Sequence, residues 1–274
     1  MTYKTLMVQL AVGKSNAELL RVTGDLAARH DARIVGIAAC QPMPFAYGDG
    51  YPSGAAIMDF QNEIKADLRD AETEFRDALK ASKAKLEWRS AYTTESLPYY
   101  LACEARCADL IIASVGTAGT LDTPRHTSLG VLVMRAGRPV LVVPHTGANT
   151  PLDRIVVAWK DTREARRAAV EALPILAFAS HVTVVEVADE SDMPAARGRV
   201  EDVASWLALH GIAAVSSAVT SHGDNFDKID ALLNKHAADL VVAGAYGHSR
   251  LREWAFGGVT HGLLKGGHCA LLAH

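Results

Sequence analysis

Glycines at fixed intervals near the carboxyl terminus leave stretches of backbone bare. In "GAYGHSRLREWAFGGVT" (244–260) they are Gly244, Gly247 and the pair Gly257 and Gly258. A helix start offers unpaired N–H groups and a partial positive charge, and residues without a Cβ atom let an anion reach them. The spacing therefore favours a phosphate-binding turn. A tight turn that packs a helix closely, without any ligand, is the alternative.

Other candidates for chemistry are weaker. The "GKS" at 13–15 follows a predicted strand, yet a phosphate-binding P-loop would require glycine at Val8, inside that strand. Histidines gather in 210–274 without the spacing of metal ligands, so surface or core histidine is the simpler interpretation. No nucleophile–base pair is evident. The sequence therefore predicts neither a metal site nor an enzyme.

Composition limits the partners. The chain has 274 residues and a formal net charge of −3, which gives no positive field for nucleic acid or for an anionic membrane surface. No apolar run approaches the length of a membrane-spanning helix, and the first one is too short for a signal peptide. Four cysteines at irregular positions do not form a disulfide framework. These features predict a cytoplasmic protein.

The chain repeats itself. Residues 108–144 align with 238–274 without a gap, which pairs Asp109 with Asp239. The fronts of the two halves align at a larger offset, so the first half carries an insertion. We place the insertion in the Pro- and Gly-rich segment 41–56 and expect it to be mobile or to cover the cleft of the first half.

Domain boundaries follow from the repeat. The polar, turn-forming "PHTGANTPLD" separates the halves and predicts domains at 1–146 and 152–274. Short apolar runs alternate with helical patterns, which predicts a doubly wound α/β domain, twice. Ligands of such sheets bind beyond the carboxyl ends of the strands, normally the first and fourth. For the second half we expect strands at 154–159, 181–187, 213–219, 239–244 and 268–273 and helices at 162–178, 194–209, 225–237 and 258–265.

The spacing G-x2-G-x9-G, followed by a small residue, resembles the nucleotide-binding signature of the universal stress protein family. The resemblance covers the whole chain, including "AWKDTREARRAA" after the boundary and the final "ALLAH". It implies two tandem doubly wound parallel five-stranded sheets of order 3-2-1-4-5, an adenine nucleotide alpha hydrolase-like fold. The halves would pair pseudo-symmetrically through their last strands, "VLVV" and "ALLA", as an intramolecular pseudo-dimer, with a further homodimer left open.

The same resemblance implies a site for ATP in the second half, with Mg²⁺ arriving on the phosphates. The phosphate and ribose side would consist of Gly244, Gly247, His248, Gly257, Gly258, Val259 and Thr260. The base would lie against Ala158, Trp159, Lys160, Asp161, Thr162 and Val187. Many members of the family carry an aspartate where this chain has Lys160, with Asp161 one position later.

In the first half the corresponding motif is degenerate. Ala11 stands at the acidic position, and the glycine positions hold Ser114, Thr117, Thr127 and Ser128, whose Cβ atoms would obstruct phosphates. We therefore expect no nucleotide there. The function that the resemblance implies is a stress-response or regulatory protein that binds an adenine nucleotide without catalysis. A nucleotide-free module that presents its paired domains to a protein partner is the alternative, and slow ATP hydrolysis is the least favoured one.

Overall fold

The structure, a computed structural model, describes residues 2–42, 53–115, 123–144, 150–221, 225–247, 258–265 and 267–274. Contacts divide the chain into two compact units, called here the N-terminal unit (Tyr3–Ala136) and the C-terminal unit (Gly137–His274, with Thr2). Most of the expected insertion, 43–52, lies outside the described residues, so its role stays a prediction.

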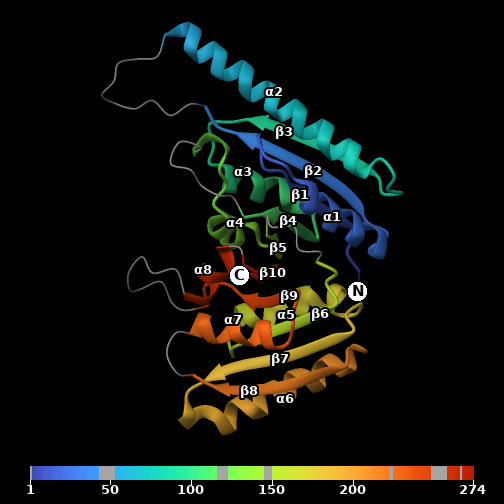
Figure 1. Ribbon diagram of the computed structural model, residues 1–274, viewed down its shortest axis with the longest axis vertical. Helices are drawn as coiled ribbons and strands as arrows, with labels where there is room; N and C mark the ends of the chain where they lie inside the picture. Colours follow the sequence, from blue (N-terminus) through green and yellow to red (C-terminus); the bar gives the residue numbers. More distant parts are fainter. Residues whose placement is uncertain are drawn as a thin grey trace. The chain divides into compact units, whose positions relative to one another are not determined.

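The N-terminal unit contains a parallel sheet in the order β3-β2-β1-β4 (Figure 1). Its strands are β1 (Thr5–Gln9), β2 (Arg33–Cys40), β3 (Leu86–Tyr92) and β4 (Leu110–Ser114). Its helices are α1 (Ala17–His30), α2 (Gly54–Leu79), α3 (Leu97–Glu104) and α4 (Leu129–Ala136), with short 3-10 turns η1 (Ala105–Cys107) and η2 (Thr123–Arg125). Helix α2 has 26 residues but is rich in charged side chains. No helix of the described residues is long and apolar enough to span a membrane.

The C-terminal unit contains strands in the order β5-β10-β9-β6-β7-β8. They are β5 (Val140–Val143), β6 (Arg154–Trp159), β7 (His181–Ala188), β8 (Ala214–Thr220), β9 (Leu240–Gly244) and β10 (Ala270–Ala273). Its helices are α5 (Arg163–Leu176), α6 (Met193–Leu209), α7 (Asn225–Lys235) and α8 (Gly258–Leu264), with the 3-10 turn η3 (Glu190–Asp192). The five strands of the second repeat have the expected order 3-2-1-4-5, which is thereby confirmed.

The last strands of the two repeats pair with each other. Strand β5, "VLVV", runs antiparallel to β10, "ALLA", with Leu141 opposite Leu271. The expected pairing through these strands is therefore confirmed. It also explains why the contacts group β5 with the second half, so that the boundary between the units precedes β5. The boundaries 1–146 and 152–274, as limits of two domains, stay a prediction.

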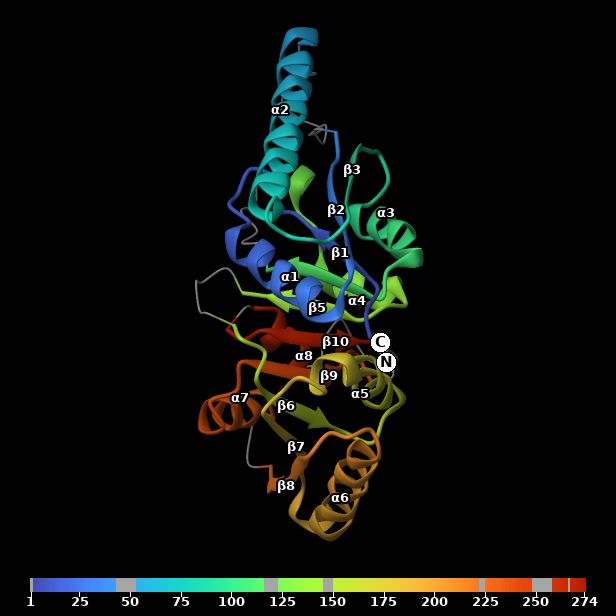
Figure 2. The same cartoon turned by 90° about the vertical axis from the view of Figure 1, so that its right-hand side faces the viewer.

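Helices cover the C-terminal sheet unevenly. Helix α6 packs on β7 and β8, while α5 packs on β9 and β10. Figure 2 shows α7 on the side of the sheet opposite to α6. Within the described part of the chain, that second side has little helical cover over β7 and β8, and Val215 on β8 is 67% exposed. We call this side of β6, β7 and β8 the open face; the register places Val156, Thr183 and Val215 on it together.

An aspartate holds the first strand of each repeat, β1 and β6, through hydrogen bonds to its backbone. The Asp109 carboxylate accepts hydrogen bonds from the backbone N–H groups of Lys4 and Thr5, at 2.7 and 2.9 Å. The Asp239 carboxylate accepts them from Asp153 and Arg154, at 3.0 and 3.1 Å. The two aspartates are the pair that the sequence alignment matched, so the same contact supports the repeat in three dimensions.

We expect Asp239→Ala to lower the free energy of unfolding of the C-terminal unit by about 1 to 2 kcal/mol, because two backbone donors lose their acceptor. Burial raises the pKa of Asp239 despite its backbone hydrogen bonds, so desolvation offsets part of the gain from the ionised carboxylate. Asp239→Asn keeps one acceptor oxygen and should lose less. Urea unfolding of both variants measures the difference, and an unchanged midpoint for Asp239→Ala would show that the contact contributes nothing.

Candidate functional site

A short turn, residues 160–162, connects β6 to α5 at the carboxyl edge of the C-terminal sheet. Thr162 caps the helix, since its Oγ1 atom accepts a hydrogen bond from the Ala165 N–H at 3.3 Å. Asp161 accepts a hydrogen bond from Arg166 at 2.6 Å, and both side chains are more than half exposed. Asp161, which follows strand β6, is thus held at the surface by the guanidinium of Arg166 in the next helix, α5.

The open face gathers two of the residues expected beside the base. Ala158 pairs with Val185, and Val187 stands two positions further along β7, so Ala158 and Val187 share the open face. Both are half-buried. Trp159 pairs with Glu186 and so lies on the opposite face; its buried indole Nε1 has no hydrogen-bond partner among the described residues.

Gly244 lies directly against the start of α5. A Cβ atom at Gly244 would be 2.4 Å from the Ala165 nitrogen and 2.6 Å from the Glu164 carbonyl carbon. A Cβ atom at Gly247 would be 3.0 Å from Glu164 Oε2 and 3.1 Å from Thr162 Oγ1. Close packing on the helix backbone therefore accounts for Gly244, whereas the atoms nearest to Gly247 belong to side chains. Their contact with a nucleotide stays a prediction.

The turn after the first strand differs between the two repeats. In the N-terminal unit it spans residues 10–16 and is closed by Asn16, whose Oδ1 accepts from the Ala11 N–H at 2.8 Å and whose Nδ2 donates to the Ala11 carbonyl at 3.1 Å. Ser114 ends β4 there and is buried, at the position of Gly244. In the second repeat the turn is shorter, residues 160–162, and helix α5 packs against the fourth strand of that repeat, β9. The fourth strand ends in serine in the repeat with the longer turn and in glycine in the repeat with the shorter turn.

Glu164 is a buried carboxylate that the sequence did not single out. It is 4% exposed in the first turn of α5 and ion-paired with Arg163. Burial acts to raise the pKa of Glu164, but hydrogen bonds from Arg163, the backbone and Thr162 outweigh it and hold the pKa below its usual value. The only signal in the sequence is an acidic residue in a first helical turn. Ionised and beside Gly247, it can accept hydrogen bonds from hydroxyl or N–H groups.

The first turn of α8 supplies the end of the glycine motif. Gly258 is exposed, Val259 is half-buried and Thr260 is 6% exposed. His248 and Gly257 lie outside the described residues. The structure thus places Gly244, Gly247 and Gly258 but not the chain between the last two. Within the described ranges, no group of three or more His, Cys, Asp or Glu side chains could hold a metal ion.

Another glycine fixes α8 against α7. A Cβ atom at Gly262 would be 2.2 Å from Cδ2 and 2.5 Å from Cγ of Phe226. In an exposed helix, replacing glycine by alanine stabilises by about 1 kcal/mol. Overpacking against the ring costs about 3 kcal/mol. We therefore expect Gly262→Ala to lose about 2 kcal/mol of stability.

A double-mutant cycle with Phe226→Leu tests this contact by urea unfolding. The smaller side chain should restore part of the stability lost in Gly262→Ala, so that the two effects are not additive. Additive losses would mean that the ring does not restrict residue 262.

Comparisons with known proteins agree with this geometry. Residues 151–273 match the model of the Universal stress protein family. The structure of a universal stress protein from Archaeoglobus fulgidus is 13% identical, with a TM-score of 0.75 over 98% of this chain and 97% of that chain. A putative universal stress protein from Pseudomonas aeruginosa is 17% identical, with a TM-score of 0.59 over 99% and 93%. At such identities these structures show the fold alone. No curated protein matches the chain.

Proposed function

We propose, because residues 151–273 match the model of the Universal stress protein family, that this chain is a stress-response regulatory protein that binds one adenine nucleotide. The nucleotide is ATP, and its site is the carboxyl edge of the C-terminal sheet. The observation that carries the proposal is the half-buried pair Ala158 and Val187, which share the open face where β6 and β7 end. The neighbouring strand β9 ends there at Gly244, where the glycine motif begins.

In this proposal the adenine, the ribose and the phosphates of ATP each contact a different group of residues. The adenine ring packs on the apolar surface of Ala158 and Val187. The phosphates reach the N–H groups at the start of α8, where Gly258 is exposed. Mg²⁺ comes with the phosphates, since it keeps several waters and needs few protein ligands. Glu164, beside Gly247, accepts hydrogen bonds from ribose hydroxyls, because a carboxylate would repel the phosphates.

The N-terminal unit binds no nucleotide in this proposal. Ser114 and Thr127 are buried at two positions that hold glycine in the second repeat, and the Ala11 N–H is already bonded to Asn16. The protein is not an enzyme in this proposal, and nucleotide occupancy is its signal. The second candidate function is a nucleotide-free module that presents a surface to a partner protein. The close packing of Gly244 on α5 favours it, since that contact explains the glycine without a ligand.

The nucleotide content of the purified chain separates the two candidates. Heat releases any bound ligand from freshly purified protein, and an anion-exchange column identifies and counts it. One adenine nucleotide per chain supports the proposal. No nucleotide, together with no shift of the melting temperature in added Mg-ATP, supports the partner-binding module. Two nucleotides per chain would contradict the proposal that the N-terminal unit binds none.

A further inference from the structure

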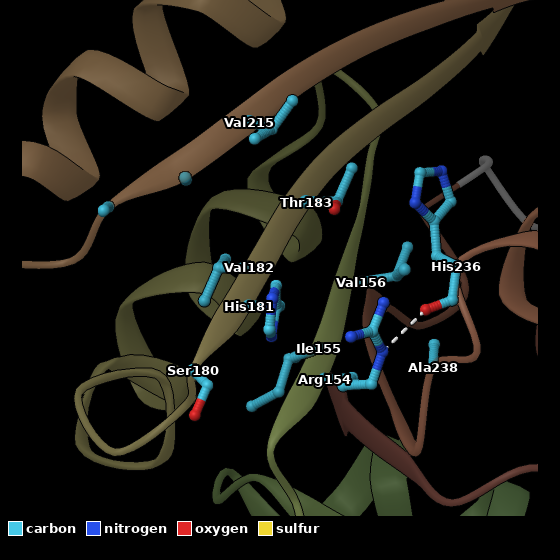
Figure 3. Close-up of a pocket in the computed structure, with 12 residues that line it drawn as sticks. Arg154, Ile155, Val156, Ser180, His181, Val182, Thr183, Val215, His236 and Ala238 are labelled. Carbon is cyan, nitrogen blue, oxygen red and sulfur yellow. Dashed lines mark hydrogen bonds between the residues drawn. The ribbon is translucent and has the colours of Figure 1, made fainter.

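A cavity lies at the amino edge of the C-terminal sheet, at the opposite end of the strands from the proposed nucleotide site. Its volume is about 430 Å³. The side chains that matter come from the starts of β6, β7 and β8 and from the residues after α7: Arg154, Val156, His181, Thr183, Val215 and His236. Figure 3 shows Arg154, Thr183 and His236 around one space. Small-molecule sites typically measure about 300–1,000 Å³, so this cavity suits a ligand at the small end of that range.

Arg154 is held in place but lacks a carboxylate partner. Its Nε atom donates a hydrogen bond to the His236 carbonyl at 3.0 Å, drawn as the dashed line in Figure 3. Among the residues that the structure describes, Arg154 forms no ion pair within 4 Å, and only its charge acts on Asp153, whose pKa it helps to lower. The nearby carboxylates are engaged elsewhere: Asp239 with backbone N–H groups and Asp153 with Ser180, at 2.6 Å. The terminal nitrogens of a fixed guanidinium are thus available to an anion.

The N-terminal unit has a carboxylate at a position where the C-terminal unit has an apolar side chain. At the equivalent register positions it has Arg33 in place of His181 and Glu87 in place of Val215. Glu87 forms ion pairs with Arg89 at 2.7 Å and with Arg33 at 3.8 Å. The cations on that face therefore have a carboxylate from their own sheet. In the C-terminal unit an exposed apolar side chain, Val215, replaces the carboxylate, and Arg154 stands where the N-terminal unit has Thr5. Among the described residues, the open face therefore carries a guanidinium without a carboxylate from its own sheet.

We propose that this cavity is a binding site for a small organic carboxylate with an apolar body, such as an aryl or short acyl acid. The carboxylate binds the Arg154 guanidinium, which presents parallel N–H donors suited to two oxygens. The apolar body lies over Val156 and Val215. His181, His236 and Thr183 supply further donors at the rim. This site is independent of the proposed nucleotide site and does not rest on it.

Benzoate, benzyl alcohol and acetate are the probes, titrated into the full ¹⁵N-labelled chain and followed by NMR. We expect saturable shifts at residues 181–183, 215 and 236 with benzoate. Benzyl alcohol lacks the charge and acetate lacks the ring, so each should bind at least about tenfold more weakly. Arg154→Gln should weaken benzoate binding at least about tenfold, because charge-assisted hydrogen bonds are lost.

Two further variants keep the test independent of folding defects. Val215→Glu places a carboxylate on the cavity wall at a position that is 67% exposed and should abolish benzoate binding. Leu209→Glu makes the same change at the end of α6, where the side chain is 86% exposed, and should bind benzoate like the wild type. No saturable shift with benzoate, equal binding of either other probe, or undiminished affinity in Arg154→Gln or Val215→Glu would overturn the proposal.

Discussion

Gly244→Ser is expected to lower the free energy of unfolding of the C-terminal unit by about 3 kcal/mol. The added Cβ atom would meet the Ala165 nitrogen at 2.4 Å and the Glu164 carbonyl carbon at 2.6 Å. Both atoms belong to the backbone of α5, so relief requires a shift of the helix rather than the rotation of a side chain. Urea unfolding followed by circular dichroism measures the loss.

Ser114→Gly is the matched control for this change, because Ser114 ends the fourth strand of the N-terminal unit. It should cost no more than about 1 kcal/mol, the usual effect of glycine in a strand. A Gly244→Ser chain as stable as the wild type would mean that α5 does not pack on β9 as described. If both variants lost a similar amount of unfolding free energy, the shorter turn at 160–162 would not explain the need for glycine at 244.

The proposed nucleotide site predicts a large effect at the other end of the glycine motif. Gly258→Val should weaken ATP binding by at least about a hundredfold, because charge-assisted hydrogen bonds contribute about 1.5–3 kcal/mol each and the side chain obstructs two of them. Calorimetric titration with Mg-ATP measures this change. Gly258 is exposed at the first position of α8, where valine is tolerated, so the melting temperature of the free chain should hardly change.

Gly198→Val provides the comparison for this binding experiment. Gly198 lies in α6, and a Cβ atom there would have no neighbour within 4 Å. The variant should bind Mg-ATP like the wild type. If Gly258→Val also kept its affinity, the glycines would serve packing alone, and the nucleotide-free module would be the better account.

Much of the fold can be predicted from the sequence because parallel strands buried on both faces are short apolar runs. In the second half the expected strand 154–159 has those bounds in β6, and the expected helix 194–209 begins one residue earlier in α6. The repeat also locates Asp109 and Asp239, which fasten the first strands. The bounds of strands and helices depend on neighbouring residues, and the two aspartates are visible because the sequence repeats.

The reason for Gly244 cannot be predicted in this way. Its neighbours, Glu164 and Ala165, are distant in sequence, and their approach depends on the length of the turn before α5. Glycine patterns suggest bare backbone but not which group comes close to it. The cavity around Arg154 is equally hidden, because the open face depends on where helices pack. Only the comparison of Val215 with Glu87, through the register of two sheets, reveals the missing carboxylate.

The pairing of β5 with β10 has a consequence for synthesis on the ribosome. About 130 residues separate these strands, so the edge of β5 that pairs with β10 emerges long before its partner. At the usual rate of translation this interval lasts on the order of ten seconds. Throughout it, the nascent chain exposes four apolar residues, "VLVV", with unsatisfied backbone groups along one edge. In crowded polysomes the β10 strand of another copy that has not yet paired with its own β5 can occupy that edge first, which would give a strand-swapped dimer.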